Sequence, residues 1–201
     1  MSDIYKPKDF RGLLGTSGMS EALLTNHFTL YEGYVKNTNA LLDLLQTKEV
    51  GTPEYAELKR RFGWEWNGMR LHEYYFGNLS PSPKGRDGGD LLAASLKKDF
   101  GSFEAWEKDF RGVGAMRGIG WTILSYDPVA GRLFNGWVNE HDGGHLSGSI
   151  PLLVLDVFEH AFMLDYGLKR AEYIETFFRA IDWEVVSKRF DEVSKNENKS
   201  S

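Results

Sequence analysis

The chain has 201 residues, of which 41% are hydrophobic and 14% aromatic, enough to bury one good core or two small ones. Its formal net charge of −5 argues against nucleic-acid binding through a basic surface. Cysteine is absent, which excludes disulfides, thiolate ligands and cysteine nucleophiles, so a bound metal ion would be held by nitrogen and oxygen atoms.

No apolar run approaches the roughly 20 residues that a membrane-spanning helix needs. Residues 1–15 lack the continuous apolar segment of a signal peptide. We therefore expect a cytoplasmic protein that does not cross a membrane.

Two long helices are predicted in the first half, after a polar, glycine-containing arm over residues 1–18. The first covers residues 21–45 behind an N-cap serine, and its apolar residues recur at the helical period. The second covers residues 53–76 behind an N-cap threonine, with proline at its first position. A short link between two long helices makes an antiparallel hairpin, in which His27 and His72 can face the same space.

A proline- and glycine-rich loop over residues 80–89 is predicted to separate two domains, 1–86 and 87–201. In the second domain, helices are predicted over residues 91–100, 102–117, 171–181 and 183–193. Strands are predicted over residues 121–126, 132–139 and 151–155, with a tight turn between the first two. The sequence therefore predicts an α+β fold, in which a long α-helical hairpin precedes an α/β domain with a three-stranded antiparallel sheet and flanking helices.

Three ionisable residues, Asp156, Glu159 and His160, interrupt the apolar stretch that follows the last predicted strand. Burying an unpaired carboxylate costs on the order of several kcal/mol, so the fold must supply a partner. The strand ends at Asp156, and one helical turn later His160 returns to the same side, where both can bind one metal ion. A buried Asp–His hydrogen bond explains the same pattern without a metal, and this stretch alone does not decide between the two.

The first helix carries an aromatic stripe made by His27, Tyr31 and Tyr34, which share one face at positions i, i+4 and i+7. Such a stripe is more often part of a core than of a functional site. An imidazole on an apolar face nevertheless needs a partner for each of its nitrogens.

The segment Asp156-Val-Phe-Glu-His-Ala-Phe162 resembles the signature Asp-x-Trp-Glu-His-Ala-Tyr of the iron/manganese superoxide dismutases. Further matches occur in family order and cover about residues 15–192. They are Gly33-Tyr-Val-Lys-Asn37, Leu71-His-Glu-Tyr-Tyr-Phe76, Gly120-Trp-Thr122 and Arg170-Ala-Glu-Tyr173. Each motif alone is weak, but the combination is specific.

The resemblance implies that four residues hold one iron or manganese ion per chain: His27, His72, Asp156 and His160. It implies that the ion cycles between its 3+ and 2+ states and disproportionates superoxide to oxygen and hydrogen peroxide. The ligands suit either metal, and we favour iron. An apolar shell around the site is expected from Trp64, Tyr75, Trp121 and Phe158, which are plain core residues otherwise.

Four more residues take roles from the resemblance. Tyr34 matches the tyrosine at the substrate entrance, and His141 matches the Gln or His that hydrogen-bonds the metal-bound solvent. Arg170 matches an arginine that draws superoxide to the site, although a structural ion pair explains it nearly as well. Glu159 matches the residue that bonds a ligand histidine of the other subunit, which implies a homodimer or homotetramer. We interpret His145 as an ordinary loop histidine.

The chain departs from the family pattern at several positions. The family's first ligand lies eight residues before the tyrosine, whereas His27 lies seven before Tyr34, and position 26 is Asn. The family's longer spacing is absorbed by a π-bulge, so we expect a regular helix here with His27 as the ligand. Phe158 replaces the signature tryptophan. The two closing tyrosines are replaced by Phe162 and Met163, and the first-helix His that pairs across the dimer is replaced by Leu30 or Tyr31.

Two other functions remain open at the level of the residues. A mononuclear non-haem iron oxygenase uses two His and one carboxylate, but a third His and an aromatic shell leave little room for an organic substrate. The non-enzyme alternative is a metal-stabilised dimeric protein with the dismutase fold and no useful turnover.

Overall fold

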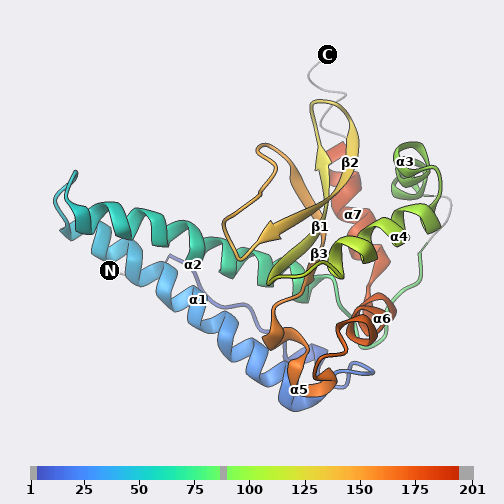
Figure 1. Ribbon diagram of the computed structural model, residues 1–201, viewed down its shortest axis with the longest axis horizontal. Helices are drawn as coiled ribbons and strands as arrows, with labels where there is room; N and C mark the ends of the chain where they lie inside the picture. The colour runs from blue at the N-terminus through green and yellow to red at the C-terminus, as the bar shows by residue number, and fades with distance from the viewer. Residues whose placement is uncertain (1–3, 87–89, 195–201) are drawn as a thin grey trace.

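The computed structural model describes residues 4–86 and 90–194. A long helical hairpin projects from one side of a body made of the sheet and the remaining helices (Figure 1). In chain order the elements are η1 (Arg11–Leu13), α1 (Glu21–Thr47), α2 (Pro53–Gly77), α3 (Leu91–Phe100), α4 (Phe103–Gly114), β1 (Gly120–Asp127), β2 (Arg132–Asn139), β3 (Ile150–Asp156), η2 (Glu159–Ala161), α5 (Met163–Tyr166), α6 (Arg170–Ala180) and α7 (Trp183–Ser194), where η denotes a 3-10 helix. The predicted α+β class is confirmed.

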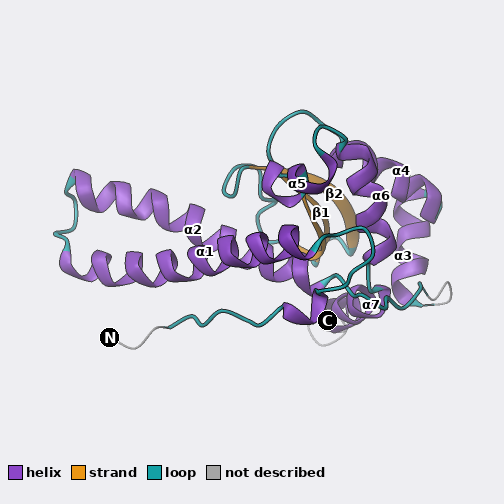
Figure 2. Cartoon of the chain, turned by 90° about the horizontal axis from the view of Figure 1, so that it is seen from below, coloured by secondary structure: helices purple, strands orange, loops and turns teal. Residues whose placement is uncertain are grey.

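The two hairpin helices begin where their caps predict. The Ser20 side chain accepts a hydrogen bond from the Leu23 amide, and the Thr52 side chain accepts one from the Tyr55 amide. The N-terminal arm runs beside the hairpin (Figure 2). The Tyr5 amide donates to the Asn39 side chain over 3.0 Å, which ties the arm to α1.

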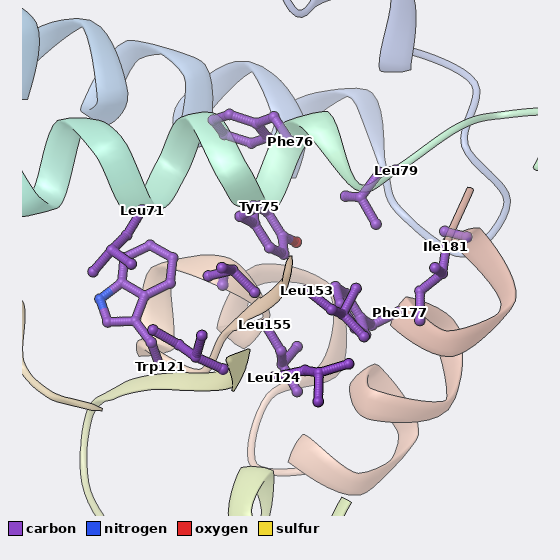
Figure 3. Packing of buried hydrophobic residues seen from close by; sticks show 14 of the residues in the cluster. Leu71, Tyr75, Phe76, Leu79, Trp121, Leu124, Leu153, Leu155, Phe177 and Ile181 are labelled. Carbon is purple, nitrogen blue, oxygen red and sulfur yellow. The ribbon is translucent and has the colours of Figure 1, made fainter. Parts of the chain in front are cut away.

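The three strands form an antiparallel sheet in the order β2-β1-β3. β1 is central and buried along nearly its whole length, so Trp121 pairs with Val138 on one side and with Asp156 on the other. α2 packs on β3, and Figure 3 shows Leu71 and Tyr75 of α2 among the leucines of the sheet. This packing places α2 beside the end of β3, where Asp156 lies.

One predicted helix is too long. The prediction for residues 102–117 ends at Gly114 in the structure, although its predicted N-cap, Ser102, does accept from the Ala105 amide. Glycines explain the early end, because Gly114 is a poor helix former and Gly118 and Gly120 adopt φ values of 126° and 151°.

The predicted domain boundary between residues 86 and 87 adjoins residues 87–89, which lie outside the described residues, and it stays a prediction. No described helix is long and apolar enough to cross a membrane.

A link between the two ends of the chain had no signal in the sequence. The Asp165 carboxylate of α5 accepts from the Ser20 amide over 2.7 Å and from the Ser20 hydroxyl over 2.6 Å. The Tyr166 hydroxyl donates to the Gly18 carbonyl and lies 2.6 Å from the Thr176 hydroxyl. Gly18 has a φ of 83°, and a Cβ there would lie 2.7 Å from Thr176, so glycine is required at this approach. The start of α1 is thereby held against α5 and α6.

Candidate metal centre

Four side chains from distant parts of the chain meet at the base of the hairpin: His27 of α1, His72 of α2, Asp156 at the end of β3 and His160 of η2. One ligand atom of each lies within 4.8 Å of the others. The Asp156 Oδ2 atom lies 3.2 Å from the Nε2 atoms of both His27 and His160, and 3.6 Å from that of His72. The structure therefore brings together the four residues that the resemblance implies.

The regular winding of α1 decides which of its side chains reaches the metal centre. α1 is an uninterrupted α-helix from Glu21 to Thr47, as predicted, without a π-bulge. His27 is buried on the Tyr31 face, whereas Asn26 is exposed. The regular helix absorbs the shorter spacing and keeps an imidazole at the centre.

His72 presents an unpaired ring nitrogen to the cluster. Its Nδ1–H donates to the Gly68 carbonyl over 2.6 Å, which leaves the lone pair on Nε2. Within the described part of the chain, this Nε2 atom is buried and has no hydrogen-bond partner. An unpaired buried polar atom costs about 1–3 kcal/mol. A metal ion between His72 and Asp156 would remove this cost, so the donor set fits the group.

The charge state of the cluster also suits a metal ion. Burial alone would raise the pKa of Asp156, but the charge and hydrogen bond of His160, together with those of His27, hold it well below its usual range. Burial lowers the pKa of His27 and lowers that of His72 more strongly. The Phe158 amide donates to Asp156 Oδ1 over 2.8 Å and leaves Oδ2 toward the histidines. Neutral imidazoles and one carboxylate suit iron or manganese.

A chain of hydrogen bonds lies beside the cluster. The Trp121 indole N–H donates to His141 Nδ1 over 3.1 Å, and His141 Nε2 lies 2.7 Å from the Tyr34 hydroxyl. The Tyr34 ring stacks on His72 with 5.2 Å between centroids. Burial lowers the pKa of His141 to about 4 and raises that of Tyr34 well above 10. The structure places both predicted residues beside the ligands, with His141 neutral and Tyr34 protonated at neutral pH.

The aromatic shell lies where it was expected. Trp121 and Tyr75 lie against His72 and His27, with centroid separations of 4.9 and 5.2 Å. Trp64 and Phe158 both lie against His141, with centroid separations of 4.8 and 4.7 Å.

Gly68 is a site residue that the sequence interpretation missed. A Cβ at this position would lie 2.7 Å from the Tyr34 ring, so only glycine lets Tyr34 approach α2 and His72. The available signal was a glycine inside a long helix, which costs about 1 kcal/mol relative to alanine and usually has a packing reason.

Arg170 does not join the cluster. Its guanidinium donates to the carbonyls of Met116 and Gly118 over 2.6 and 2.8 Å and lies over the Phe162 ring. Among residues 4–86 and 90–194, no acidic side chain forms an ion pair with Arg170, so the alternative of a structural ion pair is not observed.

His145 lies in the loop after β2, with Nε2 2.9 Å from the His141 carbonyl, where it supports the segment that carries His141.

Comparisons with known proteins agree with this geometry. A family model described as "Iron/manganese superoxide dismutases, C-terminal domain" matches residues 88–189. "Superoxide dismutase [Fe]" of Aquifex pyrophilus is 35% identical over 94% of this chain and 92% of its own length. The chain belongs to the iron/manganese superoxide dismutase family. "Superoxide dismutase [Fe]" of Cupriavidus metallidurans is 38% identical over 87% of this chain and 89% of its own length. "Superoxide dismutase [Mn] 2" of Haloferax volcanii is 36% identical over 87% of this chain and 88% of its own length.

The predicted activity is therefore confirmed: the protein is an oxidoreductase that uses iron or manganese to disproportionate superoxide. The oxygenase and the non-catalytic alternatives are set aside by the same matches. The cluster of three histidines and one aspartate is able to hold the single metal ion of this dismutase.

Proposed function

We propose that His27, His72, Asp156 and His160 are the four protein ligands of the dismutase, and that the ion is iron, with manganese as the alternative. The observation that carries the assignment is the buried Nε2 atom of His72, which faces Asp156 with its lone pair unpaired. Both metals occur in the names of similar dismutases, and two of the three reported above are named as iron proteins.

When bound, the ion supplies one-electron redox chemistry between its 3+ and 2+ states. The overall reaction converts two superoxide anions and two protons into one oxygen and one hydrogen peroxide. The protein's own residues must therefore bring protons to a reacting anion in a site that is largely closed to water.

The hydrogen bond from Trp121 fixes the tautomer of His141, and the tautomer in turn sets the direction of the hydrogen bond between His141 and Tyr34. An indole N–H donates only, so His141 Nδ1 must accept, and neutral His141 then carries its proton on Nε2. That proton is donated to the Tyr34 oxygen over 2.7 Å. The phenol proton of Tyr34 is then directed away from His141, where it is free to be donated to solvent or to the reduced substrate.

Variants of the ligands test this proposal. His72→Ala and Asp156→Ala are each expected to lose most of the bound metal, because three donors remain and a buried partner is left unpaired. His145→Ala is the matched control, since His145 contacts only the carbonyl of His141 among these residues and should leave metal content unchanged. Purified, folded His72→Ala and Asp156→Ala with full metal content would refute the ligand assignment.

We also propose that the protein forms a homodimer, or a homotetramer, through Glu159. Support comes from the position of Glu159, which is exposed in the single chain although it lies directly between Phe158 and His160. The neighbouring Met163 and Leu164 expose 42% and 58% of their surface. Tyr31 donates to Glu73 within its own chain over 3.1 Å, so the family's cross-subunit bond at this helix would be replaced by an internal one.

A cytoplasmic location stays a prediction from the sequence. Fractionation of the source cells, followed by immunodetection in each fraction, would test it.

A further inference from the structure

One face of α2 carries a row of residues that leads from solvent to the metal centre. Arg61, Glu65, Gly68 and His72 follow one another at intervals of four, three and four residues, so they share a face. At 1.5 Å per residue, Arg61 stands about 16 Å along the axis from His72. The row passes Tyr34, whose ring lies against Gly68.

The outer two residues form an ion pair with one buried and one exposed member. The Glu65 carboxylate is buried, with Oε1 accepting from Arg61 Nε over 2.7 Å and Oε2 accepting from the side-chain Nδ2 of Asn37 in α1 over 3.2 Å. The Arg61 side chain is 56% exposed, and its guanidinium lies 5.4 Å from the Trp64 ring centre. Trp64 in turn packs on His141. A solvent-exposed cation is thus held beside Trp64, the ring that contacts His141.

The net charge of the chain explains why a cation at this place would matter for an anionic substrate. The substrate is an anion and the protein carries a net charge of −5, so its long-range field opposes approach. The Arg170 guanidinium is already bonded to two backbone carbonyls. Burial dominates the pKa values of Tyr34 and His141, but the charge of Arg61 acts on both of them.

We infer that Arg61 draws the superoxide anion to the entrance beside Tyr34, and that Glu65 is the positioning residue that fixes the guanidinium over Trp64. The inference rests on the proposed site. It assigns opposite electrostatic effects to the two members of the pair, because Glu65 carries a negative charge into the path of the same anion. If the ion pair were purely structural, substituting Arg61 and substituting Glu65 would both lower activity.

The test compares kcat/KM for superoxide at low and high ionic strength in metal-matched proteins. Arg61→Gln should lower kcat/KM roughly threefold at about 10 mM salt, and Glu65→Gln, whose amide oxygen still accepts from Arg61, should raise it. Both differences should vanish near 1 M salt, and Arg61→Lys should restore most of the loss. Arg60→Gln is the matched control, because it removes the same charge from a residue paired with exposed Glu57.

A second readout avoids turnover. Azide, a monovalent anion, is titrated into the iron-loaded proteins and followed by absorbance, and Arg61→Gln should bind it more weakly than Arg60→Gln at low salt only. An active protein in which Arg61→Gln and Arg60→Gln behave alike, or in which Arg61→Gln and Glu65→Gln both lose activity at every salt concentration, would overturn the inference. An inactive parent protein at all salt concentrations would instead contradict the proposed site.

Discussion

Two adjacent side chains of α1, Asn26 and His27, have opposite environments, because one is exposed and the other buried against Asp156. His27→Ala should abolish dismutation and weaken metal binding, since an imidazole nitrogen is lost from the cluster. Asn26→Ala should leave both nearly intact and cost at most a surface hydrogen bond of roughly 1 kcal/mol. Activity per bound metal measures both effects, and the reverse ranking would mean that Asn26 rather than His27 serves the site.

The tautomer of His141 depends on one indole N–H. Trp121→Phe keeps the ring but removes the donor, so both tautomers of His141 become accessible and the proton donated to Tyr34 is no longer fixed. A lost hydrogen bond of about 1 kcal/mol corresponds to roughly fivefold lower kcat/KM. Trp106→Phe is the control, because its N–H donates to Asn135 in the α4–β2 region. Equal activity in the two variants would remove the proposed role of Trp121.

The histidine pKa values predict how the site responds to acid. Burial lowers the pKa of both His27 and His72, so in the folded protein their nitrogens stay unprotonated below the ordinary histidine value of about 6.5. Protons therefore compete with the metal only at lower pH, and the loaded protein should keep its metal through pH 6. Metal content after dialysis across a pH series measures this. Half-release at or above pH 6.5 would show that the ligands titrate as exposed histidines do.

At the scale of elements, α5 and the start of α1 depend on each other. Asp165 bonds both the amide and the hydroxyl of Ser20, directly before the N-terminus of a 27-residue helix, where a carboxylate is favourable. Asp165→Ala should lower the free energy of unfolding by about 1 kcal/mol, discounted for its exposure. A double-mutant cycle with Ser20→Ala, followed by denaturant unfolding, should give a favourable coupling energy. Strict additivity would show that the two groups do not interact in solution.

The elements that the sequence predicted well have local causes. α1 and α2 follow from caps and helical periodicity, and β2 was predicted with its observed bounds, Arg132–Asn139. The short elements η2 and α5 were not predicted as separate units, because they are fixed by tertiary bonds such as that of Asp165 to Ser20. Contacts between residues about 145 positions apart leave no periodic pattern in the sequence.

At the scale of the whole molecule, the four candidate ligands were predictable and their neighbours were only partly so. Asp156 and His160 stand out as polar residues in an apolar stretch, and the family motifs add His27 and His72. The close approach of Tyr34 to Gly68 depends on how α1 crosses α2, and the backbone bonds of Arg170 depend on the conformation of residues 115–119. These arrangements come from packing between elements rather than from any one of them.

The assembly can be tested at the exposed start of α5. Leu164→Glu places a charge on an exposed apolar side chain of α5, the helix that follows η2 and Glu159 in the chain, so in a homodimer it should shift the protein toward monomer at micromolar concentration. Val129→Glu is the control, since Val129 is also exposed but lies in the turn between β1 and β2. Light scattering measures the mass of each protein. A monomeric parent protein would contradict the proposed role of Glu159.

The central claim is that the cluster of His27, His72, Asp156 and His160 turns over superoxide with one bound metal ion. The most direct measurement removes the metal with a chelator, reloads the protein with increasing iron or manganese, and follows superoxide consumption at each loading. Activity should be absent in the stripped protein and should rise in proportion to bound metal, up to about one ion per chain. Superoxide consumption that is unchanged by stripping, or a fully loaded protein that consumes superoxide no faster than the stripped one, would contradict it.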